Sequence, residues 1–250
     1  MLRSFFLFET ELPQGSGFPL FGLCHCSWLV SIMIVAALSG HAYRRLSVDR
    51  QKRWNKRIGM LFPVLSVYRD LVLVLTGHYG VGFLPFHLCS MAMWIAAIYC
   101  FTDNRFLGVV YVLLCVPGAA GALLFPDWNA YPLWNYMHIH DFLSHGLIVV
   151  FGVCLVCSDR IVTTWKDLWY PALFGVIGMF LFAHVNRMLH TNYWFVSQPS
   201  ADSPLVWILE KTGELLYPAG FFLFCLVVVA VWEGMILIYR RVRGSIGTIG

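Results

Sequence analysis

The sequence predicts an all-α membrane protein, a polytopic bundle of about seven transmembrane helices. Of its 250 residues, 59% are hydrophobic and only 12% are charged, whereas soluble domains carry about a quarter charged residues. Apolar runs close to the ~20 residues that cross a bilayer core recur along the whole chain, with short polar connections between them. This composition leaves no room for a large aqueous catalytic domain and argues against a nucleic-acid partner.

Seven apolar windows define the predicted helices, each crossing the bilayer once. The first, third and fourth contain no charged residue, the fifth, sixth and seventh contain one each, and the second contains Arg69 and Asp70. In chain order the windows are Gly22–Tyr43, Gly59–Gly77, Leu84–Phe101, Phe106–Phe125, His138–Ser158, Leu168–Leu189 and Leu215–Tyr239. An odd number of spans puts the two termini on opposite sides of the membrane.

The basic residues predict the direction of the chain. The connection 44–58 holds seven lysines and arginines, and cytoplasmic loops are enriched in these residues. Placing this connection in the cytoplasm puts thirteen of the seventeen basic residues on that side and Arg69 within a span. The other three are on the outer side: Arg3, Lys211 and Arg187, which lies at the outer end of the sixth window. We therefore expect the N-terminus outside and the C-terminus in the cytoplasm.

Two outer connections are long enough to cover the helix ends. Residues 126–137 are rich in tryptophan and tyrosine, which favour the headgroup layer, and residues 190–213 form the other long connection. No repeat or linker divides the sequence, so residues 1–250 are expected to form a single transmembrane domain.

In this orientation eight of the nine histidines fall in the outer half of the bundle. Within the fifth window, His138, Asp141 and His145 lie at positions i, i+3 and i+7 and share one helix face. Asp141 is then one turn from His145, where a carboxylate can orient an imidazole that acts as a general base. The same spacing also fits a structural pair that satisfies two buried polar groups.

The third window supplies a candidate nucleophile near a further histidine. Its first residues, Leu84–Ser90, are expected to open a helix with proline, so that Ser90 shares a face with His87 and Cys89 does not. A cysteine–histidine pair must therefore form between helices, with His145 as the base for Cys89. A buried, inert thiol is the alternative interpretation of Cys89.

Further polar residues near the outer helix ends are candidate substrate-binding groups. Arg69 lies inside the second window, near the expected midplane of the bilayer, and needs a partner there. Asp70 should point away from Arg69 on a helix, which leaves Glu233, Asp141 or a lipid phosphate as that partner. The remaining candidates are Tyr68, Ser90, His138, Asn186 and Asn192.

Several short motifs, in their order along the chain, resemble those of the bacterial YwaF-like integral membrane proteins. They are Phe18-Pro19-Leu20-Phe21, Leu84-Pro85-Phe86-His87-Leu88-Cys89, Phe125-Pro126-Asp127, Phe142-Leu143-Ser144-His145-Gly146 and Thr191-Asn192-Tyr193. The resemblance extends over nearly the whole chain. That family is similar in turn to a human multispanning acyltransferase of phospholipid remodelling and, more distantly, to androgen-induced membrane hydrolases that cleave lipid esters.

The resemblance implies a lipid acyltransferase or lipid-ester hydrolase of the bacterial cytoplasmic membrane, with a membrane lipid as substrate and no soluble cofactor. His145 matches the histidine of the His-Gly motif, and His87 matches that of the Pro-Cys-His motif. Phe86 stands where the human enzyme has its nucleophilic cysteine, so Cys89 is the expected substitute, or else Ser90. We expect the site to open to the outer leaflet, with His87 or a backbone N–H stabilising the oxyanion.

Two other functions fit the same residues. His87, His138, Asp141 and His145 offer the imidazole and carboxylate ligands that bind zinc and similar ions, as a metal site or part of an ion path. A lipid-binding or assembly protein without turnover is the third hypothesis. The sequence indicates no particular protein partner.

Overall fold

The computed structural model describes residues 4–247, and its regular secondary structure over that range is entirely helical. The elements are η2 (Glu9–Glu11), α1 (Leu23–Arg44), α2 (Val48–Leu75), η3 (Val81–Phe83), α3 (Leu88–Thr102), α4 (Arg105–Val110), η4 (Tyr111–Cys115), α5 (Val116–Leu124), α6 (Tyr136–Cys157), η5 (Trp165–Leu168), α7 (Trp169–Leu189), η6 (Tyr193–Phe195) and α8 (Pro204–Gly247). Six helical stretches within it are long and apolar enough to cross a membrane, and α3 is a shorter apolar helix. The predicted class, an all-α multi-pass membrane bundle, is confirmed.

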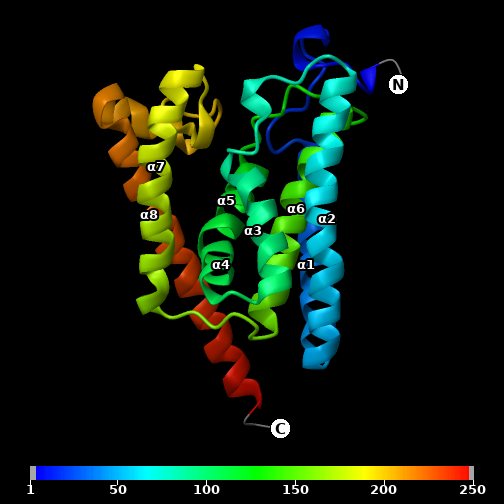
Figure 1. The fold of residues 1–250 in the computed structure, drawn as a ribbon, viewed down its shortest axis with the longest axis vertical. Coiled ribbons are helices and arrows are strands. Elements are labelled where there is room, and N and C mark those ends of the chain that lie inside the picture. The colour runs from blue at the N-terminus through cyan, green and yellow to red at the C-terminus, as the bar shows by residue number, and fades with distance from the viewer. Residues whose placement is uncertain (1–3, 248–250) are drawn as a thin grey trace.

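The helices divide into a packed group and a flanking pair. α1 packs on α6, α2 on α3, and α5 on α6. α7 lies along one flank, and α8, which contacts it, runs from the upper part of that flank to the bottom of the bundle (Figure 1). We call the end of the bundle that carries the described N-terminal residues the upper end, and the end toward which α8 runs the lower end. The connections 76–87, 125–135 and 190–203 all lie at the upper end.

The centre of the bundle is the continuous helical stretch α4–η4–α5. Its middle turn, Tyr111–Cys115, is a π-helix, and Pro117 follows it. Because proline has no N–H to donate, a regular α-helical ladder is interrupted at this point, where a wider turn is accommodated. Tyr111 is fully buried and donates its hydroxyl to the carbonyl of Ile148 on α6 at 2.9 Å, which joins the central stretch to its neighbour.

The basic segment 44–58, expected as a connection, is helical from Val48 onward. Ser47 has the extended backbone of an N-cap residue, and α2 then runs for 28 residues. The buried Asn55 accepts a hydrogen bond from the hydroxyl of Tyr43 on α1 at 2.5 Å. The first turns of α2 are therefore held against α1, and the true turn between the two helices is only a few residues long.

Two other helix boundaries differ from the sequence prediction. α3 begins at Leu88, with His87 as its extended N-cap, so Pro85 lies in the preceding connection and does not open the helix. Residues 204–212 of the expected connection 190–213 are helical, because Pro204 starts α8, and the break comes at Gly213, where φ is +71°. Glycine adopts this left-handed conformation without steric cost.

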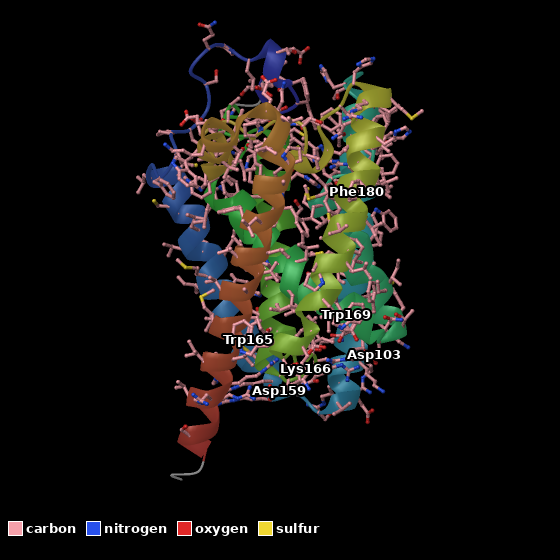
Figure 2. The ribbon with its side chains drawn as sticks, turned by 90° about the vertical axis from the view of Figure 1, so that its left-hand side faces the viewer. Asp103, Asp159, Trp165, Lys166, Trp169 and Phe180 are labelled. Atoms are coloured by element: carbon pink, nitrogen blue, oxygen red, sulfur yellow. The ribbon has the colours of Figure 1, made fainter. Side chains whose placement is uncertain are left out.

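Ion pairs hold the connections at the lower end. Arg160 bonds Asp103 at 2.5 Å, and Arg105 bonds Asp167 at 2.7 Å. Asp103, Asp159 and Lys166 are labelled at this end in Figure 2. The lower end is thus rich in charge, in contrast to the aromatic connections above.

Candidate functional site

His145 lies on α6, in the upper half of the bundle, and is only 6% exposed. Its Nδ1 lies 2.7 Å from the main-chain carbonyl oxygen of Asp141, one turn earlier. Its ring stacks on that of Trp128, with the centroids 4.8 Å apart. The imidazole is therefore fixed on both sides, by a hydrogen bond and by an aromatic face from the connection between α5 and α6.

The Asp141 carboxylate does not hold His145, although it was expected to orient that ring. Its Oδ1 lies 3.1 Å from Nδ1 of the neighbouring His140, whose Nε2 contacts the carbonyl of Leu65 on α2 at 3.3 Å. The carboxylate turns toward α2, and the backbone of the same residue takes over the orientation of His145.

Asp127, in the connection between α5 and α6, was not among the residues singled out from the sequence. It is exposed to solvent, yet the surrounding protein atoms desolvate its carboxyl group and, together with the charge of Asp141, raise its pKa to about 6, with His145 acting in the opposite direction. Protein atoms therefore surround the carboxyl group, although the residue as a whole keeps accessible surface. The only sequence signal for it was the short Phe-Pro-Asp motif.

His87 and Cys89 lie at the start of α3, and the charge of Arg69 acts on both. Burial lowers the pKa of His87 to about 4, and the charges of Arg69 and His145 act in the same direction. Cys89 is partly exposed, and the charges of Asp127, Asp141 and Arg69 all act on its thiol. Electrostatic interactions thus connect residues at the upper ends of α3 and α6 with the connection between α5 and α6. We call these residues the upper cluster: His87, Cys89, Asp127 and His145.

Arg69 has a different partner and a different depth from those expected. Its guanidinium bonds Oδ1 of the adjacent Asp70 at 2.7 Å, the carbonyl of Phe83 at 2.9 Å and Oγ of Ser90 at 3.4 Å. It lies six residues from the end of α2, about 9 Å below the upper end rather than at the midplane. The prediction that Asp70 points away was wrong, because the long arginine side chain bends back to reach it. Arg69 braces the connection 76–87 against α2 and α3.

The connection after α7 covers the approach to His87. Trp194 donates its Nε1 to the carbonyl of Phe86 at 2.8 Å, and the Tyr193 hydroxyl donates to the carbonyl of Val81. The ring of Tyr193 also packs edge-on against His87, with centroids 5.0 Å apart. Residues 193–195 thus form a lid of aromatic rings over the connection 76–87. No sequence pattern predicts this contact.

The two asparagines proposed to bind substrate organise this covering segment. The buried Asn186 donates to the carbonyl of Tyr193 at 3.1 Å and accepts its N–H at 2.8 Å. Asn192 accepts the N–H groups of Ser197 and Gln198 at 3.2 and 3.1 Å. Their polar groups are engaged by the chain itself.

Tyr68 and His138 contact aromatic neighbours. Tyr68 is exposed, and its ring lies 5.8 Å from that of Tyr136. His138 is fully buried, accepts the Trp28 Nε1–H at Nε2 (2.9 Å) and contacts the Tyr131 carbonyl through Nδ1 at 3.2 Å. Both ring nitrogens of His138 are therefore occupied.

The expected alternative metal ligands are not assembled. Between residues 4 and 247, no three histidine, cysteine, aspartate or glutamate side chains are grouped so that they could hold a metal ion. Of the four proposed ligands, His138 is occupied by other partners and the Asp141 carboxylate is turned toward His140.

Comparison with known proteins assigns the chain to a family. The model of the TMEM164 family matches residues 20–239. No curated protein and no solved structure matches the chain. The relationship to YwaF-like proteins and to lipid acyltransferases stays a prediction. The matched region contains nearly all seven apolar helices and every residue of the upper cluster, and the chain belongs to the TMEM164 family of multispanning membrane proteins.

Proposed function

We propose that the protein is a membrane-embedded lipid acyltransferase or lipid-ester hydrolase that uses Cys89 as nucleophile and His145 as general base. The observation that carries this proposal is the 2.7 Å contact between His145 Nδ1 and the Asp141 carbonyl. A carbonyl oxygen only accepts hydrogen bonds, so Nδ1 carries the ring proton and Nε2 keeps its lone pair. The imidazole is held in the tautomer that a general base needs.

Nε2 of His145 is also accessible. It has no hydrogen-bond partner among residues 4–247. It is not fully buried either, unlike the unpartnered polar atoms in the interior of that range. An unpartnered nitrogen that keeps accessible surface is free to accept a proton from a nucleophile.

Cys89 is a better nucleophile candidate than Ser90. Ser90 is 3% exposed, and its Oγ accepts a hydrogen bond from Arg69, which reduces the basicity of the oxygen. Cys89 is partly exposed, and a thiol transfers its proton to imidazole more readily than a hydroxyl does.

The proposed reaction has two steps, acylation of Cys89 and then deacylation. The Cys89 thiol gives its proton to His145 Nε2, and its sulfur attacks the ester carbonyl of a lipid. The C–O bond then breaks, the alkoxide leaving group takes the proton from His145, and an acyl thioester remains on Cys89. A water molecule or a lipid hydroxyl, deprotonated by His145, attacks the thioester and restores the thiol. The choice between water and a lipid hydroxyl separates a hydrolase from an acyltransferase.

Neutral His87 is the candidate for stabilising the oxyanion. Because burial lowers its pKa to about 4, the ring is neutral near pH 7 and offers one N–H donor without a charge. Neither ring nitrogen of His87 forms a hydrogen bond with another described residue, and neither is fully buried.

Turnover of labelled phospholipid by the purified protein tests the proposal. We expect His145→Ala and Cys89→Ala each to lower turnover by about 10²–10⁴-fold. Cys26→Ala is the matched control, since Cys26 is another partly exposed cysteine at the upper end, bonded to the Phe21 carbonyl. Undiminished turnover in both site variants contradicts the mechanism, and specific lipid binding without turnover in the wild type favours the non-catalytic lipid-binding alternative.

A further inference from the structure

A recess of about 310 Å³ lies at the lower end of the bundle, far along the helices from the upper cluster. Its lining residues are Arg44, Arg45, Cys157, Ser158, Asp159 and Arg243. They come from the C-terminal end of α1, the C-terminal end of α6 and the lower part of α8. Ligand pockets typically measure ~300–1,000 Å³, so this volume suits a small polar group.

Close packing of α1 on α6 creates one wall of this lower recess. A Cβ atom on Gly40 would lie 3.1 Å from both Cys157 Sγ and Val153 Cγ1. The absence of a side chain at Gly40 thus lets the last turn of α1 approach α6, and it brings Arg44 and Arg45 beside Cys157.

Arg243 forms the opposite wall and is fixed in place. Its Nη1 donates to the carbonyl of Cys157 at 2.6 Å, its Nη2 pairs with Asp159, and its guanidinium lies 5.6 Å from the centre of the Tyr239 ring. Asp159 also contacts Arg240 Nε at 3.4 Å. The single carboxylate in the recess is therefore shared between two arginines of α8.

Arg44 and Arg45 have no such neutralising partner. Within residues 4–247 neither arginine forms an ion pair with a carboxylate, and the side chain of Arg44 bonds only the ring of His41, at 3.3 Å. Both residues are exposed. Three guanidinium groups therefore border the recess against one carboxylate, which leaves an excess of positive charge and several unused N–H donors.

We propose that the lower recess binds a phosphate group, carried by an anionic phospholipid headgroup or present as free phosphate. Guanidinium groups form paired, charge-assisted hydrogen bonds with phosphate oxygens. The recess lies where α1, α6 and α8 end, at the level where lipid headgroups meet a spanning helix bundle. A phosphate held by Arg44, Arg45 and Arg243 ties the lower part of α8 to α1.

Binding to purified protein in a neutral detergent tests this proposal, with three probes. They are dihexanoyl phosphatidic acid, dihexanoyl phosphatidylcholine and inorganic phosphate. We expect phosphatidic acid to bind more tightly than phosphatidylcholine, and the double variant Arg44→Gln/Arg45→Gln to weaken its binding by about tenfold or more. Binding of inorganic phosphate with the same sensitivity identifies the phosphate alone as the ligand, whereas its failure to bind identifies the lipid as the source.

The double variant Arg50→Gln/Arg53→Gln is the matched control. It removes the same charge from exposed residues in the first turns of α2, which do not line the recess. We expect it to leave binding almost unchanged. The proposal is overturned if both double variants weaken binding equally, or if neither phosphatidic acid nor inorganic phosphate binds.

A thermal measurement keeps the test independent of folding defects. Neither Arg44 nor Arg45 has a carboxylate partner, so their glutamine variants should unfold at the wild-type temperature without ligand. Phosphatidic acid should then raise the unfolding temperature of the wild type and of the α2 control. The same increase in Arg44→Gln/Arg45→Gln contradicts the site.

Discussion

The backbone carbonyl of Asp141, not its carboxylate, positions the imidazole of His145, at 2.7 Å from Nδ1. A main-chain acceptor fixes the tautomer of the ring without adding a negative charge beside it. The orientation therefore survives any substitution at residue 141 that keeps the helix.

Asp141→Asn tests this relationship. The carbonyl remains, so we expect lipid turnover to stay within a few-fold of the wild type, while His145→Ala loses nearly all of it. Steady-state kinetics on a labelled phospholipid compare the two. A loss in Asp141→Asn as large as that in His145→Ala would assign the orienting role to the carboxylate.

Asp127→Asn should change how stability depends on pH. Because the pKa of Asp127 is raised to about 6, from ~3.9 for an ordinary aspartate, the folded protein holds this proton more tightly than the unfolded chain does. The contribution of Asp127 to stability therefore falls as pH rises through this interval. The unfolding temperature of the asparagine variant, relative to the wild type, should be higher at pH 7.5 than at pH 4.5.

The matched control is Asp202→Asn, which removes another exposed carboxylate at the upper end. The change in unfolding temperature between the two pH values, relative to the wild type, should be larger for Asp127→Asn than for this control. An equal change in the two variants would show that protein atoms do not desolvate the Asp127 carboxyl group.

The ring of Trp194 leaves no room for a side chain at Gly178 on α7. A Cβ at this position would lie 2.3 Å from Cη2 of Trp194, so Gly178→Ala must displace the indole and should cost about 1–3 kcal/mol. Gly175→Ala, on the same helix, meets only Phe222 at an ordinary 3.4 Å. Thermal unfolding in detergent should show a lower midpoint for Gly178→Ala alone, and equal midpoints would contradict the seating of Trp194.

Tyr193→Phe should loosen the segment under the aromatic lid. It removes the hydroxyl that donates to the Val81 carbonyl, a loss worth about 1 kcal/mol. We expect faster backbone hydrogen exchange in residues 81–87. Tyr170→Phe is the control, because its hydroxyl forms no hydrogen bond among the described residues; the same exchange rates in both variants would rule out the tether.

The helical spans were predictable because hydropathy alone decides which segments can cross a bilayer. The residues at which the helices begin were harder to predict. The polar residues after Ser47 read as a loop, yet Asn55 and Gln51 bond α1 and its turn, and this tertiary contact extends α2 by nearly three turns. At Pro85, the rule that proline opens a helix placed the start of α3 three residues too early, since His87 is the N-cap.

The site was predictable only in part. Helix periodicity gives the direction of a Cβ atom but not the reach of a side chain, and this is why the Arg69–Asp70 pair and the turn of Asp141 toward His140 were missed. Asp127 carries no periodic signal because it lies in a connection. Its electrostatic interactions with Asp141 and His145 depend on the approach of α6 to the connection 125–135, which only the fold reveals.

The acyl thioester on Cys89 is the central claim, and trapping it is the most direct test. The protein is incubated briefly with a phospholipid that carries a labelled acyl chain, quenched with acid and examined by peptide mass spectrometry. We predict the label on Cys89, its release by neutral hydroxylamine, and its absence in Cys89→Ala and His145→Ala. Turnover of the lipid with no acyl group on Cys89, or a label that persists in Cys89→Ala, would contradict the account.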